Sequence, residues 1–164
     1  MMRIRPASFI LAAILGLTLA PQFAAATQTP AFSPAQRQVL ATIHRLLDGI
    51  NRSDLKEVTG ACASQTAIID EFAPHVWHGT AACGQWFHDF TAANHEEGIA
   101  AGTASMGPPT QVQVSGSTAY VVAPASYAYQ RHGKAVTESG ATFTVALQRT
   151  GGRWLITGWA WSAR

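Results

Sequence analysis

The stretch FTVALQRTGGRWLITGWAWS, residues 143–162, predicts two antiparallel β-strands and decides the class of fold. The segments on both sides of Gly151-Gly152 are β-rich, and this dipeptide is typical of a turn. The first of the two strands reaches back to about residue 136, and other β-rich segments precede it near residues 103–106, 111–114 and 118–130. The second half of the chain is therefore expected to form a meander of antiparallel strands.

The register of the central hairpin of this meander can be predicted from its turn. If His132-Gly133 are its two loop residues, Arg131 faces Lys134 and the numbers of paired residues sum to a constant. The pairs expected on this basis are Tyr127 with Glu138, Tyr129 with Val136, and Val121 with Thr144.

The first half of the chain carries helical patterns. Ser33-Pro34-Ala35-Gln36 predicts a capped helix start, and apolar residues at helical spacing then continue to about Ile50. A second, shorter helix is expected from the cap Ser53 to about Ala61. A third is expected to open at Gly79-Thr80, with Thr80 as its N-cap, and to fade between Asn94 and Gly98.

A short strand is expected between the second and third helices. TAIIDEF, residues 66–72, alternates so that Ile68, Asp70 and Phe72 share one face while Ile69 and Glu71 share the other. Helices followed by a meander define an α+β fold, in which a curved antiparallel sheet wraps around N-terminal helices. A conical cavity between the two layers is the natural place for a small ligand.

The first 26 residues have the pattern of a secretory signal peptide. Arg3 and Arg5 precede an apolar run from Phe9 to Ala20, and small residues follow at Ala24-Ala25-Ala26. Cleavage near Ala26 would leave residues 27–33 as a disordered lead-in and 34–164 as the domain, exported to the periplasm or secreted. The alternative is that the segment stays attached as an N-terminal anchor.

The charge of the expected mature chain is nearly balanced. The sequence has 11 Lys+Arg and 9 Asp+Glu, and Arg3 and Arg5 leave with the leader, so nine basic residues face nine acidic ones. A protein with no basic stripe is not expected to bind nucleic acid, and no membrane association is expected once the leader is removed.

The two cysteines, Cys62 and Cys83, both lie in the exported part. An even count in an oxidising compartment favours a disulfide between them, and two buried free thiols are the alternative.

The order of elements resembles the nuclear transport factor 2-like superfamily and, within it, the SnoaL-like proteins, which are similar to ketosteroid isomerases and polyketide cyclases. The resemblance rests on IIDEFAPHVWHGTAACGQWFHDF, residues 68–90, after two helices, and on residues 143–162 at the end. It covers about residues 35–162. It implies a cone-shaped, cystatin-like fold, and leaves open whether the chain is an enzyme, a ligand carrier or an interaction module.

The resemblance to the isomerases carries over only in part. It places Asp70 at the position of the general base and Trp161 at that of a pocket tryptophan. The two oxyanion donors of the isomerases fall on Leu46 and Thr144, of which only Thr144 can donate a hydrogen bond, and a weaker one. Because the loss of one oxyanion donor costs about 10²–10³ in rate, steroid isomerisation by this route is not expected.

Asp70 is the first candidate catalytic residue. Burial at the floor of the cone would raise its pKa, as a base requires, whereas the alternative is a carboxylate that accepts backbone N–H bonds. A dehydratase arrangement would pair Asp70 with His88 or His75. Glu71 is expected to face water. His75 and His78 have an H-x-x-H spacing, but a zinc site needs three or four converging ligands, and no metal or cofactor is predicted.

The candidate pocket residues are mainly aromatic, and a small apolar molecule is the expected ligand. They are Trp77, Trp86, Tyr127, Tyr129, Glu138, Thr144, Trp159 and Trp161. The alignment turns Thr144 towards the cavity, whereas burial would turn Phe143, Val145 and Leu147 towards the helices. A homodimer that covers the Phe143 face of the sheet would remove this conflict, and a homodimer is predicted.

The predicted function is that of an exported binding domain with a conical pocket for a small apolar ligand. One alternative is a proton-transfer enzyme, an isomerase, dehydratase or cyclase with Asp70 as its base. The other is a protein-interaction module that uses a face of its sheet.

Overall fold

The computed structural model describes residues 31–163. The signal peptide predicted at residues 1–26, and all of the lead-in before Ala31, lie outside this range. The helices are α1 Pro34–Asn51, α2 Leu55–Ala61 and α3 Ala82–Glu96. The strands are β1 Cys62–Ile69, β2 Val76–Gly79, β3 Ile99–Met106, β4 Gln111–Ser115, β5 Thr118–Arg131, β6 Lys134–Thr150 and β7 Arg153–Ser162.

The helix starts confirm one predicted cap and correct two. Ser33 accepts a hydrogen bond from the Gln36 amide at 3.2 Å and forms the expected capping box at the start of α1. The cap of α2 is Asp54, not Ser53, because the Asp54 carboxylate accepts the Glu57 amide at 3.0 Å. Helix α3 begins without any side-chain cap, so the prediction for Thr80 was wrong.

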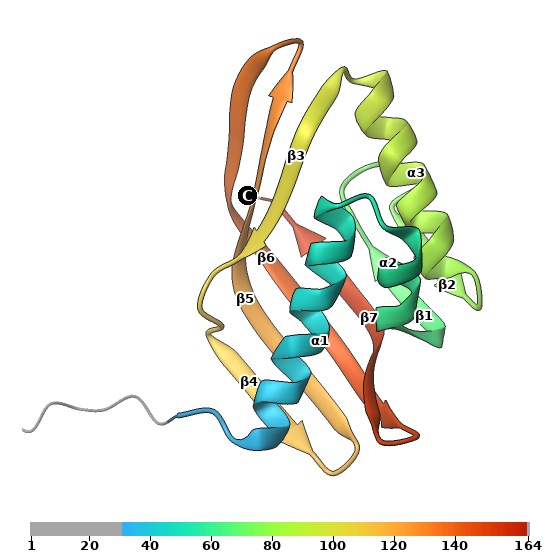
Figure 1. Cartoon of the computed structure of the whole chain (residues 1–164), viewed down its shortest axis with the longest axis vertical. Helices are drawn as coiled ribbons and strands as arrows, with labels where there is room; N and C mark the ends of the chain where they lie inside the picture. Colours follow the sequence, from blue (N-terminus) through green and yellow to red (C-terminus); the bar gives the residue numbers. More distant parts are fainter. Residues whose placement is uncertain (1–30, 164) are drawn as a thin grey trace, which may run out of the picture. The chain divides into compact units, whose positions relative to one another are not determined.

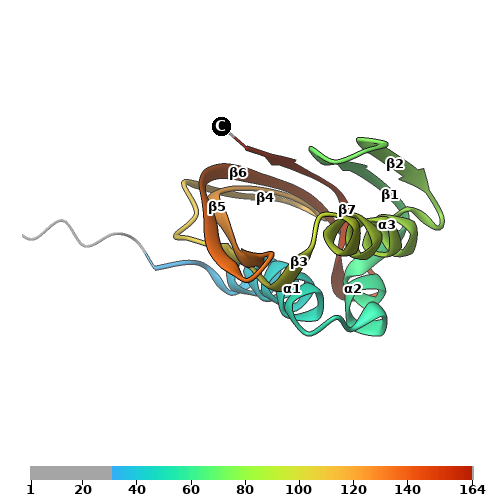
Figure 2. The same cartoon turned by 90° about the horizontal axis from the view of Figure 1, so that it is seen from above.

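The predicted α+β fold is confirmed, with a seven-stranded sheet in the order β2-β1-β7-β6-β5-β3 and β4 paired to β5. The three helices cover one face of this sheet (Figures 1 and 2). The sheet is mixed and not purely antiparallel, because β1 runs parallel to β7. The sequence prediction placed a strand at 66–72, whereas β1 ends at Ile69 and a short loop leads to β2, which was not predicted.

The central hairpin has the predicted register near its turn and a different one farther away. Tyr127 pairs with Glu138 and Tyr129 with Val136, as expected. The expected pair of Val121 with Thr144 is wrong, because a β-bulge at Gly140, which has a φ of 86°, inserts one extra residue. Val121 pairs with Val145 instead. A one-residue insertion in one strand moves all later side chains of that strand to the other face.

The bulge resolves which side of β6 faces the helices. Phe143 is 2% exposed and belongs to the core, together with Val145 and Leu147. Thr144 lies on the other face of β6, between the exposed Thr142 and Ala146. Placing Thr144 in the cavity was therefore wrong. The packing reason for a homodimer through the Phe143 face disappears with it, and dimerisation itself stays a prediction.

The packed end of the molecule is a fully buried core. Its side chains come from both layers and are at most 2% exposed: Val39, Ile43, Val58, Val121, Val145, Leu147 and Ile156. Next to α2, a disulfide joins Cys62 at the start of β1 to Cys83 at the start of α3, with 6.5 Å between the Cα atoms. The predicted pairing is confirmed. Closing a loop of this length stabilises the fold by about 3 kcal/mol in the chain-entropy model.

Within residues 31–163, no helix combines the length and the apolar character needed to cross a membrane.

Candidate functional site

The candidate site is a cavity of about 270 Å³ between the helical layer and the part of the sheet that includes Tyr127, Glu138 and Trp161. Helix α1 contributes Leu46, Leu47 and Ile50, all on the face that its apolar spacing turns towards the sheet. Helix α3 and its C-cap residue contribute side chains three and four residues apart, which therefore lie on one face: Trp86, Phe90, Ala93 and Asn94 from the helix, and Glu97 from the cap. The opposite wall comes from β5, β6 and β7.

Asp70 is the buried polar group of this cavity. It is 9% exposed and sits just after β1, in a loop closed by the hydrogen bond of its own amide to the His75 carbonyl at 3.1 Å. One carboxylate oxygen accepts the Trp86 indole N–H at 2.9 Å, and the other accepts the Glu71 amide at 2.8 Å. Burial raises the pKa of Asp70, although these two hydrogen bonds act in the opposite direction.

Two further carboxylates line the cavity near Asp70. Glu138 on β6 accepts a hydrogen bond from the Tyr129 hydroxyl at 2.6 Å. Partial burial, and then the negative charges of Glu138 and Asp70, raise the pKa of Glu71. Glu71 is exposed, as the strand alternation predicted, but it still contributes to the cavity lining.

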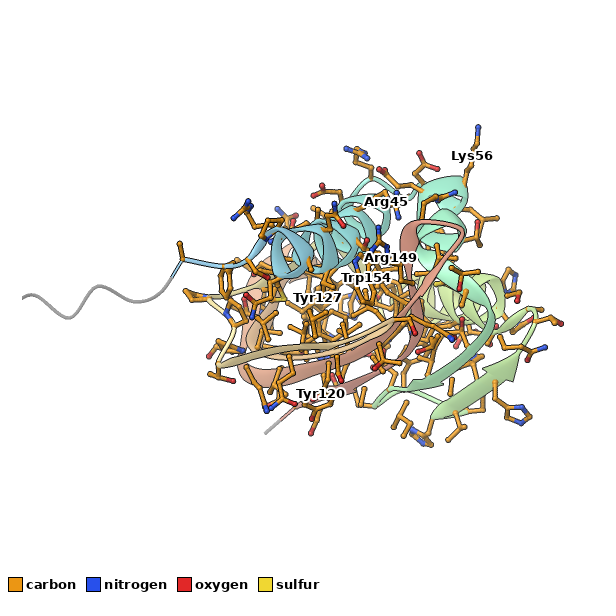
Figure 3. All side chains as sticks on the ribbon, turned by 90° about the horizontal axis from the view of Figure 1, so that it is seen from below. Arg45, Lys56, Tyr120, Tyr127, Arg149 and Trp154 are labelled. Carbon is orange, nitrogen blue, oxygen red and sulfur yellow. A yellow bond between two sulfur atoms is a disulfide. The ribbon has the colours of Figure 1, made fainter. Side chains whose placement is uncertain are left out.

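Tyr127 supplies a hydroxyl to the cavity from β5. Its oxygen accepts a hydrogen bond from Asn94 Nδ2 at 3.0 Å, so the hydroxyl proton remains available to a ligand. Figure 3 shows Tyr127 between the sheet and the helices, whereas Tyr120 of the same strand projects from the opposite face. Gly102 on β3 makes room for the ring, because a Cβ atom there would lie 2.7 Å from Tyr127 Cζ.

Aromatic rings form most of the remaining wall. Trp86 and Phe90 are stacked, with ring centroids 5.2 Å apart, and Trp159 meets Trp86 edge-on at 5.1 Å. Tyr127 and Tyr129 follow on β5 at 5.1 Å from each other. Rings that pack against one another support the shape of this wall.

Most of the candidate residues taken from the sequence meet at this cavity. Those that line it are Asp70, Trp86, Tyr127, Tyr129, Glu138, Trp159 and Trp161. Trp77 does not line it. Its ring packs against Phe72 at 4.9 Å, and its N–H donates to Asp89 at 2.9 Å, which is the main reason why the pKa of Asp89 is lowered. Thr144 faces away, as described above.

The histidines are not brought to the Asp70 carboxylate. His88 is an exposed residue of α3 whose Nδ1 lies 3.1 Å from Asp89. His75 Nδ1 lies 3.3 Å from the backbone carbonyl of Asp70, not from its carboxylate. A dehydratase arrangement of Asp70 with either ring is therefore absent from the described part of the chain. In the same range, no three His, Cys, Asp or Glu side chains gather as metal ligands.

Sequence reasoning missed several lining residues. Phe90 and Asn94 follow Trp86 at intervals of four, and this spacing was a usable signal once α3 was predicted. Leu46 was placed on the apolar face of the first helix, but as a site residue it was considered only as the position of a missing oxyanion donor. Phe143 could not be placed, because its side of the sheet depends on the bulge at Gly140.

Comparisons with solved structures agree on the fold. A nuclear transport factor 2-like superfamily protein of Salmonella enterica is 16% identical, with a TM-score of 0.65 over 78% of this chain and 89% of that one. A nuclear transport factor 2-like protein with a cystatin-like fold from Novosphingobium aromaticivorans is 17% identical, with a TM-score of 0.64 over 78% and 80%. Aln2 of a Streptomyces species is 14% identical, with a TM-score of 0.65 over 82% and 94%.

The chain thus has the cystatin-like fold of the nuclear transport factor 2-like superfamily. No family model matches its sequence, and no curated protein matches it.

Proposed function

We propose that this protein binds a compact, flat, largely apolar ligand in the cavity between its helices and its sheet. The observation that carries the proposal is an aromatic-walled cavity of about 270 Å³ that contains one buried carboxylate, Asp70. A preformed apolar cavity with few polar groups is the usual form of a small-molecule site.

The volume limits the size of the ligand. An apolar cavity of about 150 Å³ is enough for benzene, whereas sites for drug-sized molecules begin at about 300 Å³. The cavity of this protein lies between these values, which favours a ligand of bicyclic size.

The polar groups define two contacts for such a ligand. Each oxygen of Asp70 uses one lone pair in the bonds from Trp86 and Glu71, so a further acceptor site remains. The hydroxyl proton of Tyr127 supplies a donor. A flat apolar molecule with one donor and one acceptor fits these groups. If the leader at residues 1–26 directs export, this binding takes place outside the cytoplasm.

Filling the cavity tests the proposal. Ala93 lines the cavity on α3, whereas its neighbour Ala92 is exposed and outside the lining. Naphthalene should quench the fluorescence of the cavity tryptophans in the wild type. We expect Ala93→Leu to weaken its binding by at least about tenfold, because the added atoms occupy ligand space, and Ala92→Leu to leave it unchanged. Equal binding by both variants would place the naphthalene elsewhere.

A second candidate function, proton transfer, is favoured by the burial of Asp70. A carboxylate with a raised pKa is a stronger base than an exposed one, and it lies where a ligand C–H group could reach it. The isomerase oxyanion positions remain unmatched, because Leu46 is apolar and Thr144 faces away from the cavity. The Tyr127 hydroxyl is the donor that could replace them.

Deuterium exchange into 2-tetralone tests this second function. Asp70 would take a proton from the carbon next to the carbonyl, and a deuteron from the solvent would return to the same carbon. We expect NMR to show exchange above the buffer rate with the wild type and with Asp48→Asn, whose exposed acid is on α1, but not with Asp70→Asn. If the wild type gives only the buffer rate, proton transfer to this class of ketone is excluded, and binding alone stands.

A further inference from the structure

We propose that the ligand of the cavity is an organic cation, an amine or quaternary ammonium group carried on a flat apolar body. This inference rests on the proposed binding function and names the chemical class of the ligand. Two features of the cavity carry it, the imbalance of charge in its lining and the aromatic character of its wall.

Acidic residues are concentrated at the cavity. Four of the nine acidic residues of the chain line it, namely Asp70, Glu71, Glu97 and Glu138. Arg131 is the single basic residue in the lining, and it is ion-paired with Glu97. The other ion pairs among residues 31–163 are Arg52 with Glu57 and His88 with Asp89. Three carboxylates of the lining therefore have no cationic partner in the described part of the protein.

Two of these carboxylates, which line the same cavity, act on the third through their negative charges. Glu71 experiences the negative charges of both Glu138 and Asp70, in addition to its partial burial. Asp70 is almost fully removed from water, and its protein partners are the neutral N–H groups of Trp86 and Glu71. A cationic group among them would offset the repulsion and compensate the buried charge, whereas an anionic ligand would add a further negative charge.

The wall of the cavity suits the same kind of ligand. Its indole, phenol and phenyl rings carry negative electrostatic potential on their faces and attract a nearby cation, most strongly when water is excluded. The rings in the lining belong to Phe72, Trp86, Phe90, Tyr127, Tyr129, Phe143, Trp159 and Trp161. Aromatic rings together with carboxylates are the combination by which proteins hold alkylated ammonium groups.

The inference predicts a definite pH dependence. The raised pKa values of Asp70 and Glu71 mean that they become neutral at a higher pH than ordinary carboxyl groups. As the pH is lowered and these two carboxyl groups become neutral, the affinity of the cavity for a permanent cation should therefore fall. Its affinity for a neutral ligand should not. The titratable and charged groups that face Asp70 or line the cavity beside it are His75, Glu71, Glu97, Tyr127, Tyr129, Arg131 and Glu138.

Three probes of nearly equal size provide the test. Phenyltrimethylammonium is a permanent cation, tert-butylbenzene is its neutral isostere, and benzenesulfonate is an anion. We expect calorimetry at pH 7.5 and low salt to give at least about tenfold tighter binding of the cation than of the isostere, and no binding of the anion. Lowering the pH to 5 should reduce this ratio.

Variants that remove one negative charge test which carboxylates favour binding of the cation. Glu71→Gln and Glu138→Gln should each weaken binding of the cation by about threefold, as expected for partly exposed charge pairs, and leave tert-butylbenzene unchanged. Glu138→Gln keeps a side-chain oxygen that can still accept the hydrogen bond from Tyr129. Glu96→Gln removes the same charge from an exposed site of α3 outside the lining and should have no effect.

The outcomes separate the two proposals. If tert-butylbenzene and naphthalene bind in the cavity but the cation binds no more tightly, the charge inference is wrong and the binding function stands. If none of these probes binds, the binding function fails and the inference fails with it. A cation preference that Glu96→Gln reduces as much as Glu71→Gln would reflect overall charge and would also overturn the inference.

Discussion

The same strands form a packed core at one end of the sheet and the wall of a cavity at the other. At the packed end, the inward side chains of β5, β6 and β7 are aliphatic except for Trp154, and they are almost completely buried. At the cavity end, the same strands present Tyr127, Tyr129, Glu138 and Trp161 to a hollow of about 270 Å³. Helix α1 spans both ends, with Ile43 in the packed core and Ile50 at the cavity.

Two irregularities separate these ends. The bulge at Gly140 reverses the faces of β6, and a second register shift, at Thr157 and Gly158, reverses those of β7. Inward positions therefore change from odd to even numbers along β6 towards the turn, and from even to odd along β7, as Ile156 and Trp159 show. One extra residue in β6 and one in β7 thus change which side chains face the helices between the packed end and the cavity end.

The largest effect is expected from truncating the same residue type at both ends of α1. Ile43→Ala should lower the free energy of unfolding by about 2–5 kcal/mol, because it opens a hole in a fully buried core. Ile50→Ala should cost about 1 kcal/mol, because Ile50 already borders empty space. Urea denaturation of the two variants measures both values. An equal loss of unfolding free energy in both variants would mean that the cavity end is as tightly packed as the core end.

A smaller effect is expected at the junction of the two ends. A Cβ at Gly158 would lie 2.7 Å from the backbone oxygen of Ala67, which pairs with it across β1 and β7. Gly158→Ala should therefore destabilise the fold by about 1–3 kcal/mol.

Gly60→Ala is the matched control for this substitution. Apart from the backbone of its own helix and its chain neighbours, no atom lies within 4 Å of a Cβ at Gly60, which is in helix α2. Alanine should therefore stabilise that helix by about 0.5–1 kcal/mol. Thermal unfolding of both variants shows whether each substitution raises or lowers the stability of the fold. A neutral Gly158→Ala would mean that β1 can move away from β7 without loss.

The smallest effect is a pH dependence confined to the cavity end. The folded protein keeps a proton on Asp70 at pH values where the unfolded chain has lost it, because the pKa is raised by burial. The stability of the wild type relative to Asp70→Asn should therefore rise as the pH falls from 7, down to the ordinary carboxyl pKa of about 4. Glu71 acts with the same sign.

Asp89 is a carboxyl group whose pKa is shifted in the opposite direction, and the same measurement tests it. Its pKa is lowered, chiefly by the hydrogen bond from Trp77, so its stabilising contribution is lost only at a pH below the ordinary carboxyl range. Denaturant midpoints of the wild type, Asp70→Asn and Asp89→Asn between pH 7 and 5 compare the two. If the curves of wild type and Asp70→Asn run parallel, Asp70 is not held in the environment that the cavity proposal requires.

The sequence by itself determined those features that depend on near neighbours. The capping box at Ser33 and the apolar spacing after it defined α1, and the turn at His132-Gly133 fixed the pairs closest to it. The two cysteines were also correctly predicted to pair. Asp70, singled out as a candidate catalytic residue, is buried in the structure, and its catalytic role stays a prediction. Turn chemistry, helix caps and side-chain periodicity act over a few residues, so they can be read without knowing the rest of the chain.

Only the tertiary structure decided which side of each strand faces the helices and which charges meet at the cavity. The bulge at Gly140 removed Thr144 from the cavity and brought in Phe143, although the pairs near the turn were predicted correctly. The parallel pairing of β1 with β7 and the approach of Glu71 to Glu138 join residues far apart in the chain. Such contacts are chosen by the burial free energy of the whole domain, to which each local segment contributes only a small part.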